Sequence, residues 1–180
     1  MRPGCKVLVN GAGGGVGTIA LQIIKSLGAT VTAVDDDSKL DMLRALGADH
    51  VIDYRREDFT ESKERYDIVF DIVGRRPFSA IRRVLTAKGT YTVIGHDHYG
   101  QGAGRLLGAI PAFLRLATLA PFVSQNLSVV LPKHSVPKLE RLRSLLACRK
   151  LTPAVEEVLP IDSIRHAMAR LESGSVRGKI

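Results

Sequence analysis

The sequence contains little cysteine, no tryptophan and few other aromatic residues. Its two cysteines, Cys5 and Cys148, lie far apart and lack the spacing of metal ligands, so we interpret them as reduced thiols and expect a cytoplasmic protein without a bound metal. No secretory signal is visible. The most apolar stretch, residues 106–123, includes Arg115 and two prolines, which makes it a poor membrane span and favours a helical segment that covers a core or a partner.

The sequence also lacks a dense basic tract, although its formal net charge is +8. Arginine pairs at 55–56, 75–76 and 82–83 and the basic residues of 141–149 fall in separate segments. Such dispersed charge indicates a solvated surface and makes a nucleic-acid partner an alternative rather than the expectation. At 180 residues with 45% hydrophobic residues, the chain is long enough to form one well-buried domain.

The most informative stretch, Val7–Thr18, predicts a strand, a glycine-rich turn and the start of a helix. Ala12, Gly14 and Gly17 occupy the small-residue positions of the dinucleotide-binding GxGxxG pattern, with alanine at the first. In such a turn, backbone N–H groups and the N-terminus of the following helix stabilise a pyrophosphate. Asp35 ends the next predicted strand, near the distance at which an acidic residue meets the adenosine ribose. These features together predict a dinucleotide site.

Short apolar strands alternate with helical patterns along the chain. We expect strands at 7–10, 30–34, 51–53, 66–74, 89–94 and 128–131, and helices at 19–27, 38–46, 77–85, 136–148 and 161–171. Ser38 is the expected N-cap of the second helix, and residues 178–180 resemble the start of a further strand. The alternation predicts an α/β fold, a Rossmann-type doubly wound parallel sheet of about six strands in the order 3-2-1-4-5-6 with helices on both faces.

Several segments together resemble the medium-chain dehydrogenase/reductase superfamily and, within it, the zinc-independent quinone-oxidoreductase-like branch. They are Val7–Gly17, Leu46–Tyr54, Tyr66–Gly74, Gly89–Gly95 and Gly174–Ile180. The resemblance implies that residues 1–180 are a dinucleotide-binding domain and that the family's N-terminal GroES-like substrate domain is absent. It further implies NAD(P)H-dependent hydride transfer to a quinone or to an activated alkene or carbonyl. We expect this chain alone to be weakly active or inactive, because the substrate must be held by both walls of a cleft.

The residues expected to contact the cofactor fall in two groups. The turn is expected to contact the pyrophosphate through Ala12, Gly14, Gly15, Val16 and Gly17. The resemblance implies that the ends of the fourth and fifth strands border the nicotinamide, at Val73, Gly74, Ile94, Gly95 and His96.

The choice between NAD and NADP stays open at this point. Asp35 can accept hydrogen bonds from both ribose hydroxyls, and Asp36 and Asp37 would repel a 2′-phosphate, which favours NAD. Lys39 and Tyr54, by resemblance, match positions at which NADPH-using quinone reductases hold that phosphate. The alternatives are an exposed helix lysine and a packing tyrosine. On the resemblance we lean to NADP.

The remaining alternatives concern chemistry and assembly. His96 and His98 lack the further ligands of a zinc site, proton relay by His96 is an alternative role for that side chain, and we identify no catalytic side chain. An enoyl-thioester reductase is the enzymatic alternative, and a dinucleotide-sensing or RNA-binding module is the non-catalytic one. The resemblance also implies a homodimer through pairing of strand 128–131, which an exposed apolar stretch would favour.

Overall fold

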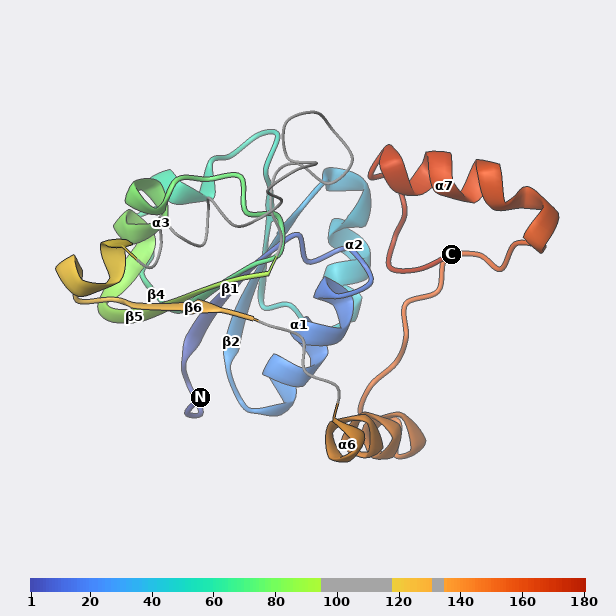
Figure 1. Ribbon diagram of the computed structural model, residues 1–180, viewed down its shortest axis with the longest axis horizontal. Helices are drawn as coiled ribbons and strands as arrows, with labels where there is room; N and C mark the ends of the chain where they lie inside the picture. Colours follow the sequence, from blue (N-terminus) through green and yellow to red (C-terminus); the bar gives the residue numbers. More distant parts are fainter. Residues whose placement is uncertain (95–117, 131–134) are drawn as a thin grey trace.

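The computed structural model describes residues 1–94, 118–130 and 135–180. A parallel sheet of six strands runs through it in the order β3-β2-β1-β4-β5-β6, which confirms the predicted order (Figure 1). The strands are β1 (Lys6–Asn10), β2 (Thr30–Asp35), β3 (His50–Asp53), β4 (Tyr66–Asp71), β5 (Leu85–Val93) and β6 (Asn126–Val129). Because all are parallel, their carboxyl ends meet at one edge, and β1 and β4 adjoin where the strand order reverses.

Helices cover both faces of the sheet, as predicted. The described helices are α1 (Gly17–Ser26), α2 (Asp37–Ala45), α3 (Phe78–Val84), α6 (Val136–Ala147) and α7 (Ile164–Glu172), with the short 3-10 turns η1 (Phe59–Glu61), η2 (Ala120–Phe122) and η3 (Ile161–Ser163). Figure 1 shows α6 and α7, in orange to red, to one side of the molecule and away from the sheet. Accordingly α6 has no buried residue and α7 buries only Ala167.

The core has two parts, one on each face. Successive side chains of a strand point to opposite faces, so Val7 and Val9 pack with α1 and α2 while Leu8 packs with α3 and η1. Leu21 and Leu43 complete the first part and are fully buried. Since every strand near the middle is covered on both faces, the sheet presents only its edges to a ligand.

The structure corrects several predicted boundaries. Asp36, not Ser38, is the N-cap of α2, because its carboxylate accepts the Ser38 N–H at 3.1 Å and the helix therefore starts one residue earlier. β5 begins directly after α3, four residues before the predicted start at Gly89. β6 spans Asn126–Val129 rather than 128–131. The expected terminal strand makes only isolated bridges, of Gly178 with Gly14 and of Lys179 with Val155.

Part of the apolar stretch at residues 106–123, predicted to be a helical segment that covers a core or a partner, lies outside the described residues. Only its end, Thr118–Val123, is described, and it contains η2. Gly95 and His96 also lie outside the described ranges. Within those ranges, no helix combines the length and apolar character needed to cross a bilayer.

Candidate functional site

The glycine-rich turn joins β1 to α1 at the carboxyl edge of the sheet. Its N–H groups at Gly11 and Ala12 donate to the Val34 carbonyl, at 3.0 and 3.1 Å, which anchors the turn to β2. A side chain at Gly17 would collide with the Gly11 and Ala12 carbonyl oxygens, so only glycine lets α1 start this close to the turn. At Gly14, by contrast, a Cβ would meet nothing nearer than the Gly11 oxygen at 3.9 Å. The backbone at Gly14 is therefore open to a close-fitting ligand.

The N-terminus of α1 has no side-chain cap, although the Thr18 N–H donates to the Gly14 carbonyl at 3.0 Å. Its N-cap residue is Val16, which makes no side-chain hydrogen bond, and the first turn contains no acidic residue. The first N–H groups of a helix lack intrahelical acceptors and carry partial positive charge. The free donors of a helix N-terminus and the open backbone at Gly14 are features that suit an anion such as a pyrophosphate.

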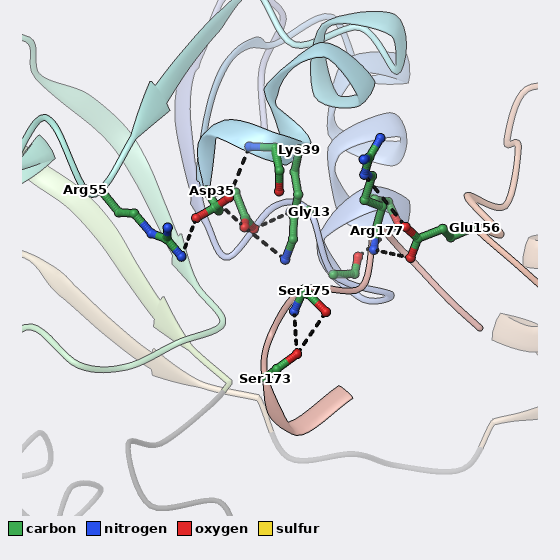
Figure 2. A network of polar contacts seen from close by, with 12 residues as sticks. Gly13, Asp35, Lys39, Arg55, Glu156, Ser173, Ser175 and Arg177 are labelled. Atoms are coloured by element: carbon green, nitrogen blue, oxygen red, sulfur yellow. Dashed lines mark hydrogen bonds and ion pairs between the residues drawn. The ribbon is translucent and has the colours of Figure 1, made fainter. Parts of the chain in front are cut away.

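Asp35 and Lys39 form a nearly buried pair beneath this turn (Figure 2). The Asp35 carboxylate accepts the Gly13 N–H at 2.7 Å through Oδ2 and the Asp36 N–H at 2.9 Å through Oδ1, and Lys39 Nζ lies 3.2 Å from Oδ1. The two side chains are 8% and 9% exposed. A Cβ at Gly13 would lie 2.5 Å from Lys39 Cδ. Glycine at position 13 thus makes room for the ion pair, and Lys39 is not the exposed lysine of the alternative interpretation.

A second, more exposed charged group surrounds the pair. Arg55 Nη2 lies 2.7 Å from Asp36 Oδ2, and its guanidinium lies 5.9 Å from the centre of the Tyr54 ring. Hydrogen bonding with Ser38, with a smaller contribution from Arg55, holds the pKa of Asp36 below its usual value. The Arg55 side chain is 68% exposed and Tyr54 is 47% exposed. The Tyr54 N–H donates to the Asp35 carbonyl at 3.2 Å, so Tyr54 follows β3 beside the end of β2, where Asp35 pairs with Lys39.

The C-terminal segment lies against the glycine turn. The Gly178 N–H donates to the Gly13 carbonyl at 2.7 Å, and the Lys179 N–H donates to the Ala154 carbonyl at 2.9 Å. A Cβ at Gly15 would lie 3.2 Å from Lys179 Nζ, so this ammonium stands beside the turn.

Ion pairs fix the approach of this segment. Glu156 accepts the Arg177 N–H at 3.1 Å and binds Arg170 at 2.8 Å, as Figure 2 shows for Glu156 and Arg177. Gly178 and Lys179 belong to a segment that carries the family resemblance, but no local signal in the sequence indicates that Lys179 lies beside the glycine turn.

The end of β4 forms the other side of the site. Asp71 is fully buried and its Oδ1 accepts the N–H groups of Val73 and Gly74, at 3.1 and 2.9 Å. The Ile94 N–H donates to the Asp71 carbonyl at 2.9 Å, which brings the end of β5 alongside. Burial first, and then the neighbouring Asp71 carboxylate, raises the pKa of Tyr91 far above its usual range. Three of the predicted nicotinamide-bordering residues therefore lie together at this edge.

A bound metal ion would need several ligand side chains to converge within the described residues. There, no three side chains of His, Cys, Asp or Glu converge closely enough to hold a metal ion. The described residues therefore provide no fit for a zinc ion.

Comparisons with known proteins agree with this geometry. A family model described as "Zinc-binding dehydrogenase" matches residues 46–180. NAD(P)H oxidoreductase RTN4IP1, mitochondrial, of Mus musculus is 31% identical over 188 residues, covering 98% of this chain and 47% of that protein. The chain spans about half the length of the curated relatives it matches.

Two solved structures show the same arrangement of elements. The quinone oxidoreductase from Coxiella burnetii superposes with a TM-score of 0.78 at 26% identity, over 98% of this chain and 52% of that one. The Escherichia coli quinone oxidoreductase complexed with NADPH superposes with a TM-score of 0.74 at 25% identity, over 99% of this chain and 56% of that one.

Proposed function

We propose a function from the premise that the chain belongs to the zinc-binding dehydrogenase family, among the quinone-oxidoreductase-like members of the medium-chain dehydrogenase/reductase superfamily. In this proposal the chain supplies the NAD(P)H-binding part of an enzyme that transfers hydride to quinones or to activated alkenes or carbonyls. The observation that carries the proposal is the glycine turn. Its backbone is open at Gly14 and it leads into a helix N-terminus without a side-chain cap. Both features suit a pyrophosphate.

The residues of this chain bind and orient in the proposed reaction. The reduced nicotinamide, when bound, supplies the hydride. Gly14, Gly15, Val16 and Gly17 would hold the pyrophosphate through backbone N–H groups, and Lys179 would add a positive charge beside Gly15. Such groups accelerate a reaction by fixing the reacting atoms relative to each other.

The nicotinamide would lie at the opposite end of the turn. Val73, Gly74 and Ile94 would border it, because they follow the strands on the far side of the point where the strand order reverses. We extend this proposal to Gly95 and His96, which directly follow Ile94 in the sequence.

We propose NADP as the preferred cofactor. Lys39 neutralises Asp35 and Arg55 neutralises Asp36, so the like-charge repulsion expected from these two carboxylates is reduced. The exposed Arg55 guanidinium and the half-exposed Tyr54 ring flank the end of β2, where an arginine accommodates a 2′-phosphate in NADP-binding folds. These contacts support the preference for NADP over NAD that the resemblance implies.

Titration of the chain with NADPH and with NADH, followed by nicotinamide fluorescence, tests both parts of the proposal. We expect NADPH to bind more tightly. Arg55→Ala should weaken NADPH about tenfold, the loss of roughly one charge-assisted hydrogen bond, and change NADH less than about twofold. Arg44→Ala is the matched control, because Arg44 also pairs with an aspartate on α2 but lies at the far end of that helix. Equal or tighter NADH binding would contradict the NADP preference, and no binding of either would contradict the function.

We also propose a homodimer through β6. In the described sheet β6 stands at the edge beyond β5, so its outer backbone groups are available to a second copy. The exposed Phe122, in the turn before β6, adds apolar surface. Light scattering at high protein concentration tests this: a dimer mass is expected, and a strictly monomeric mass would contradict it.

A further inference from the structure

We propose that Asp71 is a positioning residue that sets the shape of the nicotinamide end of the cofactor site. The inference rests on the proposed function and deepens it. The Asp71 side chain is completely buried. Its Oδ1 accepts hydrogen bonds from Asn10 Nδ2, at 2.8 Å, and from the N–H groups of Val73 and Gly74, and its Oδ2 accepts the Tyr91 hydroxyl at 3.0 Å. One carboxylate thus collects four donors.

The cluster of Asp71 and its donors links three adjacent strands. Asn10 is the last residue of β1, Asp71 is the last residue of β4, and Tyr91 lies two residues before the end of β5. Asn10 and Asp71 are paired in register, as are Asp71 and Val93. Parallel sheets of this order bind dinucleotides in the crevice at the carboxyl ends of the strands, where the order reverses between β1 and β4. Asp71 therefore ties together the strand ends that form the floor of that crevice.

The bonds to Val73 and Gly74 determine how the chain leaves β4. Gly74 has a φ of +71°, a conformation that favours glycine, and its N–H is held by Asp71 at 2.9 Å. Val73 in turn packs against the first glycine of the turn, since a Cβ at Gly11 would lie 2.8 Å from Val73 Cγ2. A shift of residues 73–74 would therefore move the wall next to the nicotinamide. Because Val73 packs against Gly11, the same shift would also displace the glycine turn.

The chemistry of the cluster favours a carboxylate over any other group. All four partners donate, and an ionised carboxylate is purely an acceptor, with enough lone pairs to bind every one of them. An asparagine can keep its oxygen on the three Oδ1 donors only by turning its NH2 toward the Tyr91 hydroxyl, which must then accept. Tyr91 is also restrained by Phe78, with ring centroids 5.9 Å apart. Asp71→Asn should therefore fold but hold residues 73–74 less firmly.

The test compares ligands that differ only at the nicotinamide end. For the wild-type chain, Asp71→Asn and Tyr91→Phe, binding of NADPH is measured beside binding of 2′-phospho-ADP-ribose, which lacks the nicotinamide. We expect Asp71→Asn to weaken NADPH about tenfold while changing 2′-phospho-ADP-ribose less than about twofold. Tyr91→Phe removes one of the four bonds, so its effect on NADPH should be smaller, about threefold.

A matched control separates positioning from general destabilisation. Asp49→Asn also removes a carboxylate that accepts a backbone N–H, that of Val31 at 2.7 Å, but Asp49 precedes β3 at the amino edge of the sheet. It should lower the unfolding temperature without changing the ratio of the two affinities. An equal loss of both ligands in Asp71→Asn, or no loss of either, would overturn the proposal. Failure of the wild-type chain to bind either ligand would instead overturn the proposed function.

Discussion

The two halves of the carboxyl edge of the sheet hold their carboxylates with different kinds of partner. Around β2 and β3, carboxylates are held by cations: Lys39 binds Asp35, and Arg55 binds Asp36. Around β4 and β5, the buried Asp71 is held by an amide, a hydroxyl and two backbone N–H groups. In the first half the Arg55 guanidinium is exposed, so salt screens its attraction to Asp36 and a charged ligand can reach it. The second half is buried and directional, so it fixes shape. The difference matches the two ends of a dinucleotide, one charged and one to be oriented.

The largest effect is expected from a substitution in the glycine turn, which both halves share. Gly17→Ala places a Cβ against the carbonyl oxygens of Gly11 and Ala12, which belong to the backbone and cannot move cheaply. We expect a loss of about 3 kcal/mol in the free energy of unfolding, measured by urea titration, together with loss of cofactor binding.

Gly14→Ala is the matched control for that variant. Its Cβ would meet no atom closer than 3.9 Å, so the free energy of unfolding should change by less than about 1 kcal/mol. The same Cβ would occupy the space left for the pyrophosphate, and cofactor affinity should still fall. A Gly14→Ala protein that binds cofactor normally would show that the open backbone is not the ligand site.

An intermediate effect is expected from the charged half. Lys39→Met leaves the nearly buried Asp35 carboxylate without its cation, which should lower the free energy of unfolding by about 2 kcal/mol. The double variant Lys39→Met with Asp35→Asn removes both charges and should regain much of that loss. Urea unfolding of the two variants at low and high salt measures the difference. If the single variant is as stable as the wild type, the pair does not stabilise this half, and the comparison between halves fails there.

The smallest expected effect is a pH dependence. The folded-state pKa of Asp36 lies below the usual value of an aspartate, chiefly because of its hydrogen bonding with Ser38. A depressed pKa stabilises the fold above the unfolded-state value, and this contribution is lost as the pH falls through the folded-state pKa. Asp36→Asn keeps a capping side chain but cannot ionise, so its free energy of unfolding should lie less than about 1 kcal/mol below that of the wild type at neutral pH.

The gap between the two proteins should close as the pH falls below about 4, toward and through the lowered folded-state pKa of Asp36. Unfolding at a series of pH values measures it, with Asp41→Asn as the control, because Asp41 is an exposed aspartate on the same helix. A gap that stays constant over this range would contradict the assignment of the shift to Asp36.

Much of the site was predictable because its signals are local. The glycine spacing, the strand before it and the helix after it all lie within Val7–Ile24, and Asp35 follows at the end of the next strand. The misplaced cap at Ser38 shows the limit of local signals, since three aspartates and a serine in a row are all good N-caps and only the backbone geometry selects Asp36. Lys179 was not predicted because it comes from the far end of the chain.

The sequence by itself determined the alternation of strands and helices and the glycine turn, because periodicity, β-branched runs and glycine conformations act over a few residues. The strand order was expected only through the doubly wound fold that this alternation indicates. Only the tertiary structure decided which charges neutralise each other and which strand ends share a carboxylate. Lys39 turns inward to Asp35 instead of outward to solvent, and Asp71 meets Tyr91 and Asn10 only once three strands are in register. The Asp71 contacts join segments remote in sequence, and the inward turn of Lys39, only four residues from Asp35, depends on the space that Gly13 leaves, so no local pattern encodes either of them.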